Sequence, residues 1–222
     1  MTCPAAAQTP ALDELLLRIS ACETCATAPL GPPLPHPPRP VLRVSSTARL
    51  LIASQAPGNL VNQSGIPFND PSGDRLRDWL GLDRESFYDV ERVAIIPMGF
   101  CFPGHDRSGG DLPPRRECRA QWHDRLFDLL PQIETVLAIG RYAQDYHLKR
   151  LGHIMPSNAS VTDIVSRWRE FVGTRQSRVI PLPHPSWRNS GWLKRHPWFE
   201  SGLLPVVRAE VAQLMTKTGK SP

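Results

Sequence analysis

The sequence predicts an α/β protein, a three-layer α/β/α sandwich around a central, mostly parallel sheet of four strands. Four short apolar runs rich in Val, Ile and Leu are the expected strands, at residues 49–53, 93–96, 135–139 and 179–182. Segments with the apolar spacing of helices alternate with them, at 74–80, 115–130, 141–151, 161–172 and 204–215. Apolar strands that alternate with helices are typical of a parallel sheet covered on both faces.

The chain length of 222 residues fits one large domain. We expect the main domain at residues 46–215. Residues 1–45 should pack on it as a short helix at 11–20, a C-x-x-C pair and a proline-rich connector at 30–40. The polar tail 216–222 is expected to be disordered.

Charge and hydropathy limit the class of protein. A net charge of +5 and a pI of about 9.2 are compatible with a polyanionic partner but do not require one. No apolar run reaches the roughly 18 residues that a membrane-spanning helix needs. Asp13 and Glu14 interrupt the apolar stretch near the N-terminus, so we expect no signal peptide and a cytoplasmic protein.

Four of the five cysteines form a set. Cys22 and Cys25 make the C-x-x-C pair, and Cys101 and Cys118 follow far along the chain, while Cys3 is left over. In a reducing compartment, clustered cysteines are more often metal ligands than disulfides. Four thiolates suit either structural zinc or an iron-sulfur cluster, and their spacing alone does not choose between them.

In parallel α/β folds, ligands bind beyond the carboxyl ends of the strands. The first strand is followed by S-Q-A-P-G at 54–58, a tight turn whose backbone amides can face a ligand. Phe68 follows in the next loop, either as a hydrophobic plug or as a stacking platform. After the last strand, residues 183–199 interleave a histidine and a serine with basic residues and tryptophans, a composition that nucleic-acid contacts use.

The order of the Q-A-P-G turn, G-I-P-F, the cysteine-bearing loop and an H-P-S turn resembles the uracil-DNA glycosylase superfamily. Within it, the chain is most similar to the iron-sulfur-containing family 4 enzymes, from about residue 20 to the C-terminus. The resemblance implies a monomeric DNA-repair glycosylase that flips a base out of DNA. It would then hydrolyse the N-glycosidic bond of uracil or of another deaminated or damaged base.

The same resemblance assigns roles to the cysteines. Cys22, Cys25, Cys101 and Cys118 fall where those enzymes bind a [4Fe-4S] cluster, and zinc is the alternative metal. We expect the metal site to hold the N-terminal helix and the loop between the last two cysteines onto the sheet. That loop would then present Arg107, Arg115 and Arg116 to DNA phosphates.

The resemblance also implies a catalytic set of Gln55, Asp70 and His184. Gln55 stands where the family has a glutamate; its amide can orient water but cannot act as a base. Asp70 is the substitute expected to act on water, while Asp74 is expected to cap the helix at 75–80. His184 would contact the base or stabilise the departing anion.

Base binding is assigned to Ala56 and to Phe68, on which the family stacks a flipped uracil. Pro97 occupies the place of the asparagine that reads uracil in the family, and it offers no side-chain hydrogen bond.

DNA contacts are assigned to Ser186, Trp187, Arg188 and Asn189, since the family's H-P-S turn holds phosphate and the following loop enters the helix. Two functions therefore stay open: a glycosylase, or a non-catalytic DNA-binding member of the superfamily. A zinc-bound interaction module is a third reading, which leaves the basic aromatic loop unexplained.

Overall fold

The computed structural model describes residues 9–172 and 178–216, so Cys3 and residues 217–222 of the expected tail lie outside it. Its sheet contains β1 (Leu50–Ala53), β2 (Val93–Ile95), β3 (Thr135–Ile139) and β4 (Arg178–Leu182). The strand order is β2-β1-β3-β4, and all three pairings are parallel. The predicted α/β class is confirmed, with a fully parallel sheet in place of a mostly parallel one.

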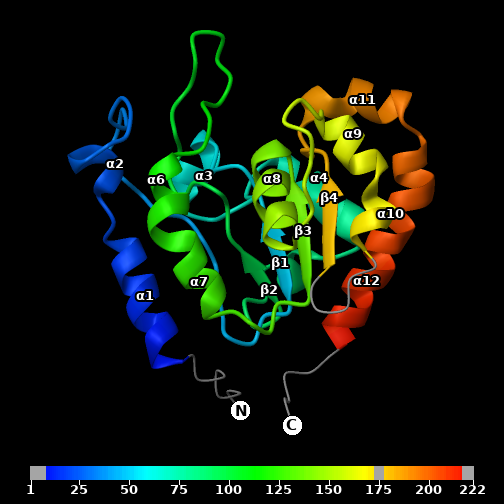
Figure 1. Ribbon diagram of the computed structural model, residues 1–222, viewed down its shortest axis with the longest axis horizontal. Helices are drawn as coiled ribbons and strands as arrows, with labels where there is room; N and C mark the ends of the chain where they lie inside the picture. The colour runs from blue at the N-terminus through cyan, green and yellow to red at the C-terminus, as the bar shows by residue number, and fades with distance from the viewer. Residues whose placement is uncertain (1–8, 173–177, 217–222) are drawn as a thin grey trace.

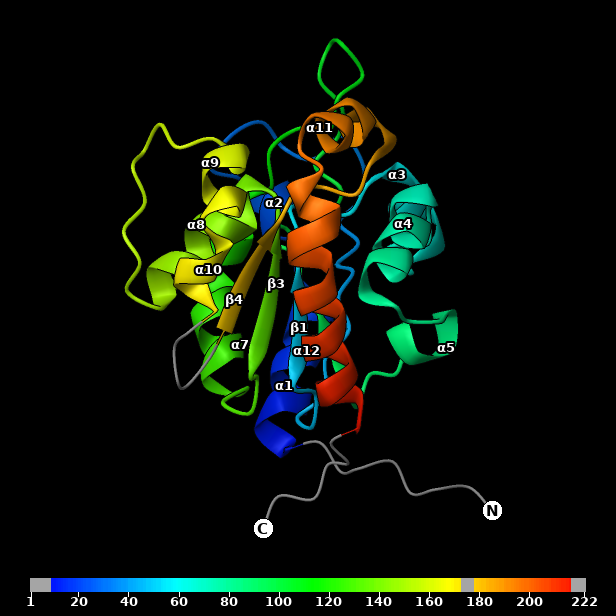
Figure 2. The ribbon, with the colours of Figure 1, turned by 90° about the vertical axis from the view of Figure 1, so that its right-hand side faces the viewer.

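Alternation along the strands divides the core into two clusters. Leu51, Ala53, Val136 and Ala138 face one side of the sheet, whereas Leu50, Ile52, Leu137 and Ile139 face the other. Successive side chains of a strand point to opposite faces, so strands that are apolar throughout need cover on both. Figures 1 and 2 show the resulting three layers.

On one face lie α1 (Pro10–Ser20), α7 (Asp124–Asp128) and α8 (Arg141–Arg150). On the other lie α4 (Pro71–Leu80) and α12 (Leu204–Thr216), as Figure 2 shows. The N-terminal helix joins the core through Leu12, Leu15 and Ile19, which are all buried. The stretch after the connector pairs with the free edge of β2, where Arg43 bridges Ile95 in antiparallel fashion. That strand edge is thereby covered.

Two predicted helices are interrupted. The segment expected at 115–130 consists of α6 (Arg116–Cys118), a π-helical turn (Arg119–His123) and α7. The segment at 161–172 breaks at Arg167 into α9 (Val161–Ser166) and α10 (Trp168–Phe171). Apolar periodicity does not show either break, because apolar residues on both sides of each break are still buried.

Five short elements lie in segments where no helix was predicted. They are α2 (Thr24–Thr27), α3 (Asn59–Ser64), α5 (Arg84–Phe87), the 3-10 turn Trp187–Asn189 and α11 (Ser190–Arg195). A further π-helical turn, Phe199–Leu203, leads into α12. In the part of the chain that the structure describes, no helix is long and apolar enough to cross a membrane.

The start of α4 corrects the predicted helix cap. The helix begins at Pro71, and Asp70 is its N-cap, with Oδ1 accepting a hydrogen bond from Gly73 N at 2.8 Å. Asp74 lies within the first turn and pairs with Arg77 at 2.5 Å. Proline is favoured at the first helical position because its φ is already set for a helix, so the cap falls on the residue before it.

Candidate active site

A cleft of about 580 Å³ lies beyond the carboxyl ends of β1, β2 and β4. It contains eight of the residues that the sequence assigned to catalysis, base binding or DNA contact: Gln55, Ala56, Phe68, Asp70, His184, Ser186, Trp187 and Arg188. Pro97 also lines it, as do His105 and Asp111, which sequence reasoning did not assign. The parallel sheet therefore brings together segments that are far apart in the sequence.

The turn after β1 is fixed to the loop after β2. Ser54 O accepts a hydrogen bond from Met98 N at 2.8 Å, and Gln55 O accepts one from Gly99 N at 2.9 Å. The side chain of Gln55 extends across this turn, and its Nε2 donates to Leu112 O at 3.4 Å. Gln55 thus connects the first turn of the cleft to the loop between Cys101 and Cys118.

Phe68 lies in an uncommon backbone conformation. Its φ of 55° is the only positive value at a non-glycine residue within 9–172 and 178–216. The ring is buried and meets Phe87 edge to face, with 6.1 Å between ring centroids. Its carbonyl accepts from Arg77 Nη1 at 3.4 Å. Left-handed backbone at a bulky residue is found where the surroundings enforce it, often at functional sites.

His184 follows β4 and faces the cleft in a defined tautomer. Ser186 N donates to His184 Nδ1 at 3.2 Å, so the neutral ring carries its proton on Nε2. Burial lowers the pKa of His184 below its usual value of 6.5, and the carboxylates of Asp70 and Asp111 oppose this shift. The imidazole is therefore neutral near pH 7 and offers an N–H donor.

The turn after His184 forms one rim of the cleft. Trp187 is 73% exposed, and the Arg188 guanidinium lies 5.8 Å from the centre of its ring. Arg75 of α4 holds this turn through Ser186 O at 2.9 Å. Asn189 does not line the cleft; its Nδ2 donates to His184 O at 2.7 Å. The side-chain amide of Asn189 thus holds the turn that follows His184.

The opposite rim is a hairpin at residues 104–112, seen in green projecting beyond α6 in Figure 1. Leu112 N donates to Gly104 O at 2.9 Å, and His105 pairs with Asp111 across the hairpin. Asp106 Oδ1 closes its tip by accepting from Ser108 N, Ser108 Oγ and Gly110 N. The glycines and aspartates in G-H-D-R-S-G-G-D are the signal from which this turn could have been predicted.

Comparison with known proteins assigns the fold to a family. The model of the Uracil DNA glycosylase superfamily matches residues 43–208, which is well over half of the chain. The chain belongs to the uracil-DNA glycosylase superfamily. A similar solved structure is the solution NMR structure of a candidate uracil DNA glycosylase from Methanosarcina acetivorans. It is 15% identical, covers 75% of this chain and 92% of that chain, and has a TM-score of 0.45.

The region that matches the superfamily includes Cys101 and Cys118 but begins after Cys22 and Cys25. In this superfamily member, Cys25, Cys101 and Cys118 are buried and Cys22 is partly buried. A hydrogen bond from Cys118 lowers the pKa of the Cys25 thiol to about 7. Burial, together with the charges of Cys25 and Cys22, raises the pKa of Cys101 to about 12.

The cysteines of this superfamily member are thus neighbours in space. Phe100 N donates to Cys118 Sγ at 3.4 Å, so a backbone amide faces this sulfur, as occurs around iron-sulfur clusters. Within the described ranges, no three or more His, Cys, Asp or Glu side chains are arranged to hold a metal ion directly. The donor chemistry fits a thiolate-bound group, since all four candidate ligands are cysteines.

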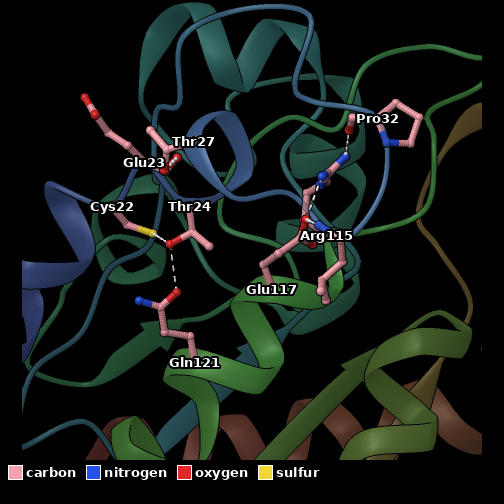
Figure 3. Close-up of polar contacts among 9 residues, drawn as sticks. Cys22, Glu23, Thr24, Thr27, Pro32, Arg115, Glu117 and Gln121 are labelled. Carbon is pink, nitrogen blue, oxygen red and sulfur yellow. Dashed lines mark hydrogen bonds and ion pairs between the residues drawn. The ribbon is translucent and has the colours of Figure 1, made fainter.

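A polar clamp joins the C-x-x-C segment to α6 (Figure 3). Arg115 donates to Pro32 O at 2.7 Å and to Glu117 at 2.6 Å, and Glu117 accepts from Leu30 N at 2.9 Å. Thr24 Oγ1 adds a bond to Gln121 Oε1 at 2.9 Å. Arg115 therefore points inward and not towards a phosphate, contrary to its predicted role, whereas Arg107 and Arg116 are exposed.

Proposed function

We propose that this protein is a DNA glycosylase that hydrolyses the N-glycosidic bond of uracil or of another deaminated or damaged base after flipping it out of DNA. The observation that carries the proposal is the shared cleft of Phe68 and His184 at the ends of the parallel strands. An aromatic ring and a neutral N–H donor are what a flipped base and its departing anion require.

The chemistry follows from the two sides of the cleft. A base that stacks on Phe68 would accept a hydrogen bond from His184 Nε2–H as negative charge develops on its carbonyl oxygen. Because His184 is neutral, it stabilises this charge as a hydrogen-bond donor, and no proton has to be transferred. Backbone amides of the turn at Ala56 and Pro57 border the same space, although the proline contributes no N–H.

Base selectivity should be broader than in a site with an amide side chain at position 97. Pro97 lines the cleft, and its carbonyl oxygen lies 3.1 Å from His123 Nε2, so the base meets neither a side-chain donor nor a free carbonyl there. Discrimination would then depend on the shape of the cleft and on backbone groups. Hypoxanthine and xanthine accordingly belong in the substrate panel beside uracil.

DNA is the partner that the superfamily implies, and we propose that a single copy of the chain engages it. Trp187 and Arg188 project from the rim where a flipped nucleotide would leave a gap in the stack. The net charge of +5 favours approach to a phosphate backbone. Sedimentation of the complex with a short duplex would give one protein per duplex.

We further propose that Cys22, Cys25, Cys101 and Cys118 bind a [4Fe-4S] cluster, with zinc as the alternative. The burial of three of the thiols and the N–H to sulfur contact at Cys118 support a thiolate-bound group. The group would supply binding free energy that fastens the N-terminal segment to α6, because metal binding free energy is also folding free energy. Iron, sulfide and zinc analysis of the purified protein distinguishes the metals, with Cys25→Ser as the test variant and Cys3→Ser as its control.

The glycosylase assignment is tested on labelled oligonucleotides that contain uracil, hypoxanthine or xanthine, in single and double strands. Alkali breaks the strand wherever a base has been removed. We expect breaks with the wild-type protein and a loss of about 100-fold or more in rate with His184→Ala. Tight binding without any abasic product would contradict the proposal and would identify a non-catalytic DNA-binding member instead.

A further inference from the structure

We propose that Asp111, oriented by His105, accepts the proton of the attacking water. The inference rests on the proposed glycosylase function and supplies the group that it lacks. Gln55 cannot act as a base, and the superfamily match does not name a replacement. Asp111 lies on the hairpin rim, in the loop between Cys101 and Cys118, where the sequence assigned no catalytic residue.

The position of Asp111 places its carboxylate over the first turn of the cleft. A Cβ added to Gly58 would lie 3.7 Å from Asp111 Oδ2, so this oxygen faces the turn after β1. The other oxygen, Oδ1, lies 3.2 Å from His105 Nδ1. The side chain is 47% exposed, which leaves room for a water molecule beside Oδ2. His105 thus holds Oδ1, while Oδ2 is available to accept a proton from water.

The hairpin that carries Asp111 is fixed at both ends. Asp106 closes its tip with three hydrogen bonds, and Gln55 Nε2 holds Leu112 O at its base. Gln55 therefore positions Leu112, the residue that follows Asp111. A base must be held within hydrogen-bond reach of its water, and these contacts provide that restraint.

Asp70, the acidic residue favoured from sequence, is less suited to this step. Its Oδ1 caps α4 by accepting from Gly73 N at 2.8 Å, and a proton on the carboxyl would weaken that cap. The carboxylates of Asp70 and Asp111 both lie close enough to His184 to raise its pKa against the effect of burial. Within the described ranges, the side chain of Asp111 pairs with His105 alone and caps no helix.

A water oxygen forms a bond to C1' of the sugar as the bond from C1' to the base nitrogen breaks. The electron pair of that bond passes to the base, whose developing charge accepts the hydrogen bond from His184 Nε2. The water proton passes to Asp111, and it returns through solvent to the released base. Throughout the step, His105 Nδ1 stays beside Oδ1 and holds the carboxylate in place.

Single-turnover cleavage of the best oligonucleotide substrate tests the assignment. We expect Asp111→Asn to lower the rate about 100-fold or more, the usual contribution of general-base catalysis. Binding to DNA with an abasic analogue should be unchanged. His105→Gln should lower the rate about 10-fold, since it removes orientation only. Asp128→Asn, at the end of α7 and away from the cleft, is the matched control and should keep the full rate.

A second variant separates chemistry from structure. In Asp111→Ala, added formate should restore part of the rate, because a free carboxylate can occupy the vacated place; a purely structural residue would not show this rescue. Wild-type rates in both Asp111 variants, or a larger loss in Asp70→Asn with an intact melting temperature, would overturn the assignment. A wild-type protein that removes no base overturns the proposed function itself, and the role of Asp111 with it.

Discussion

At the scale of single residues, Phe68 shows how the cleft obtains its aromatic wall. A left-handed backbone costs about 1–2 kcal/mol at a residue with a side chain, so neighbouring groups must favour it. Gly73 lies against the Phe68 carbonyl, and Arg77 donates to the same oxygen. The Arg77 guanidinium also lies over the Phe87 ring at 5.3 Å, which fixes the ring that Phe68 meets. Helix α4 thereby sets the conformation of the loop before it.

Gly73→Ala tests this support. A Cβ at this position would lie 1.8 Å from Phe68 O, a contact that backbone atoms cannot relieve without moving. We expect a loss of about 3 kcal/mol in the free energy of unfolding, at the upper end of overpacking effects. Urea unfolding measures it. Gly202→Ala, which meets no atom within 4 Å, is the control and should stay within about 0.5 kcal/mol of wild type.

Trp187→Ala tests the exposed rim of the cleft. The ring is 73% exposed, so its removal should leave the melting temperature unchanged. Loss of a stacking side chain should weaken binding to a uracil-containing duplex about 10-fold, within the 1–3 kcal/mol of one stacked base. Fluorescence anisotropy with labelled DNA gives the affinity. Equal affinity of the variant and wild type would exclude contact between this ring and the bases.

At the scale of elements, the short helix α6 holds the N-terminal segment. Glu117 is buried beside Cys118 and receives hydrogen bonds from Arg115 and from Leu30 N. The Arg115–Glu117 pair is almost fully enclosed, with side-chain exposures of 13% and 5%. Removing one partner of such a pair leaves a charge without compensation in the interior.

Glu117→Gln should therefore lower the free energy of unfolding by about 3 kcal/mol, although the change in side-chain size is small. Chemical denaturation of the purified protein measures the loss. Glu200→Gln on the surface serves as the control and should have almost no effect. A wild-type midpoint for Glu117→Gln would show that the clamp in Figure 3 contributes no stability.

The tip of the hairpin at 104–112 should depend on the side chain of Asp106. Asp106→Ala removes the acceptor of three hydrogen bonds at an exposed tip. We expect faster proteolysis within the hairpin without a lower melting temperature, because the tip contributes nothing to the core. Mass spectrometry locates the cut. Unchanged proteolysis relative to an Asp13→Ala control would mean that the tip is held by other contacts.

At the scale of the whole molecule, buried histidines set the response to acid. Burial lowers the pKa of His147 well below its usual value of 6.5, and burial also lowers that of His184. Below pH 6.5 the unfolded chain binds protons on these two histidines more readily than the folded protein does. The stability that the neutral rings provide is therefore complete above pH 6.5 and is lost as the pH falls towards the pKa values of the folded protein.

Each such histidine should remove up to about 1.4 kcal/mol of unfolding free energy per pH unit below 6.5. Urea midpoints between about pH 7.5 and 5 measure the slope. His147→Leu should flatten it, and the change also removes an Nε2 atom that is buried without a partner within the described residues. Gly202→Ala removes no titratable group, so it is the control variant and should keep the wild-type slope.

The sheet could be predicted from the sequence because four apolar runs alternate with helical patterns, and both signals follow from burial. Most of the cleft could be predicted as well, since Gln55, Phe68 and His184 follow strands that end at one edge. The hairpin pair was missed because His105 and Asp111 lie in an exposed turn without periodicity. The helix cap was wrongly predicted at Asp74, because Pro71 starts α4 directly after Asp70, which takes the cap instead.

The strand order also affects how the protein folds during its synthesis. The turn after β1 forms one wall of the cleft, but His184 follows β4, the last strand in the sequence and an edge of the sheet. A chain still emerging from the ribosome has made Gln55 and Phe68 long before it makes β4. Contacts between such distant segments form late in folding. The cleft is therefore completed in the same step that pairs β4 with β3, and an unfinished chain has only part of it.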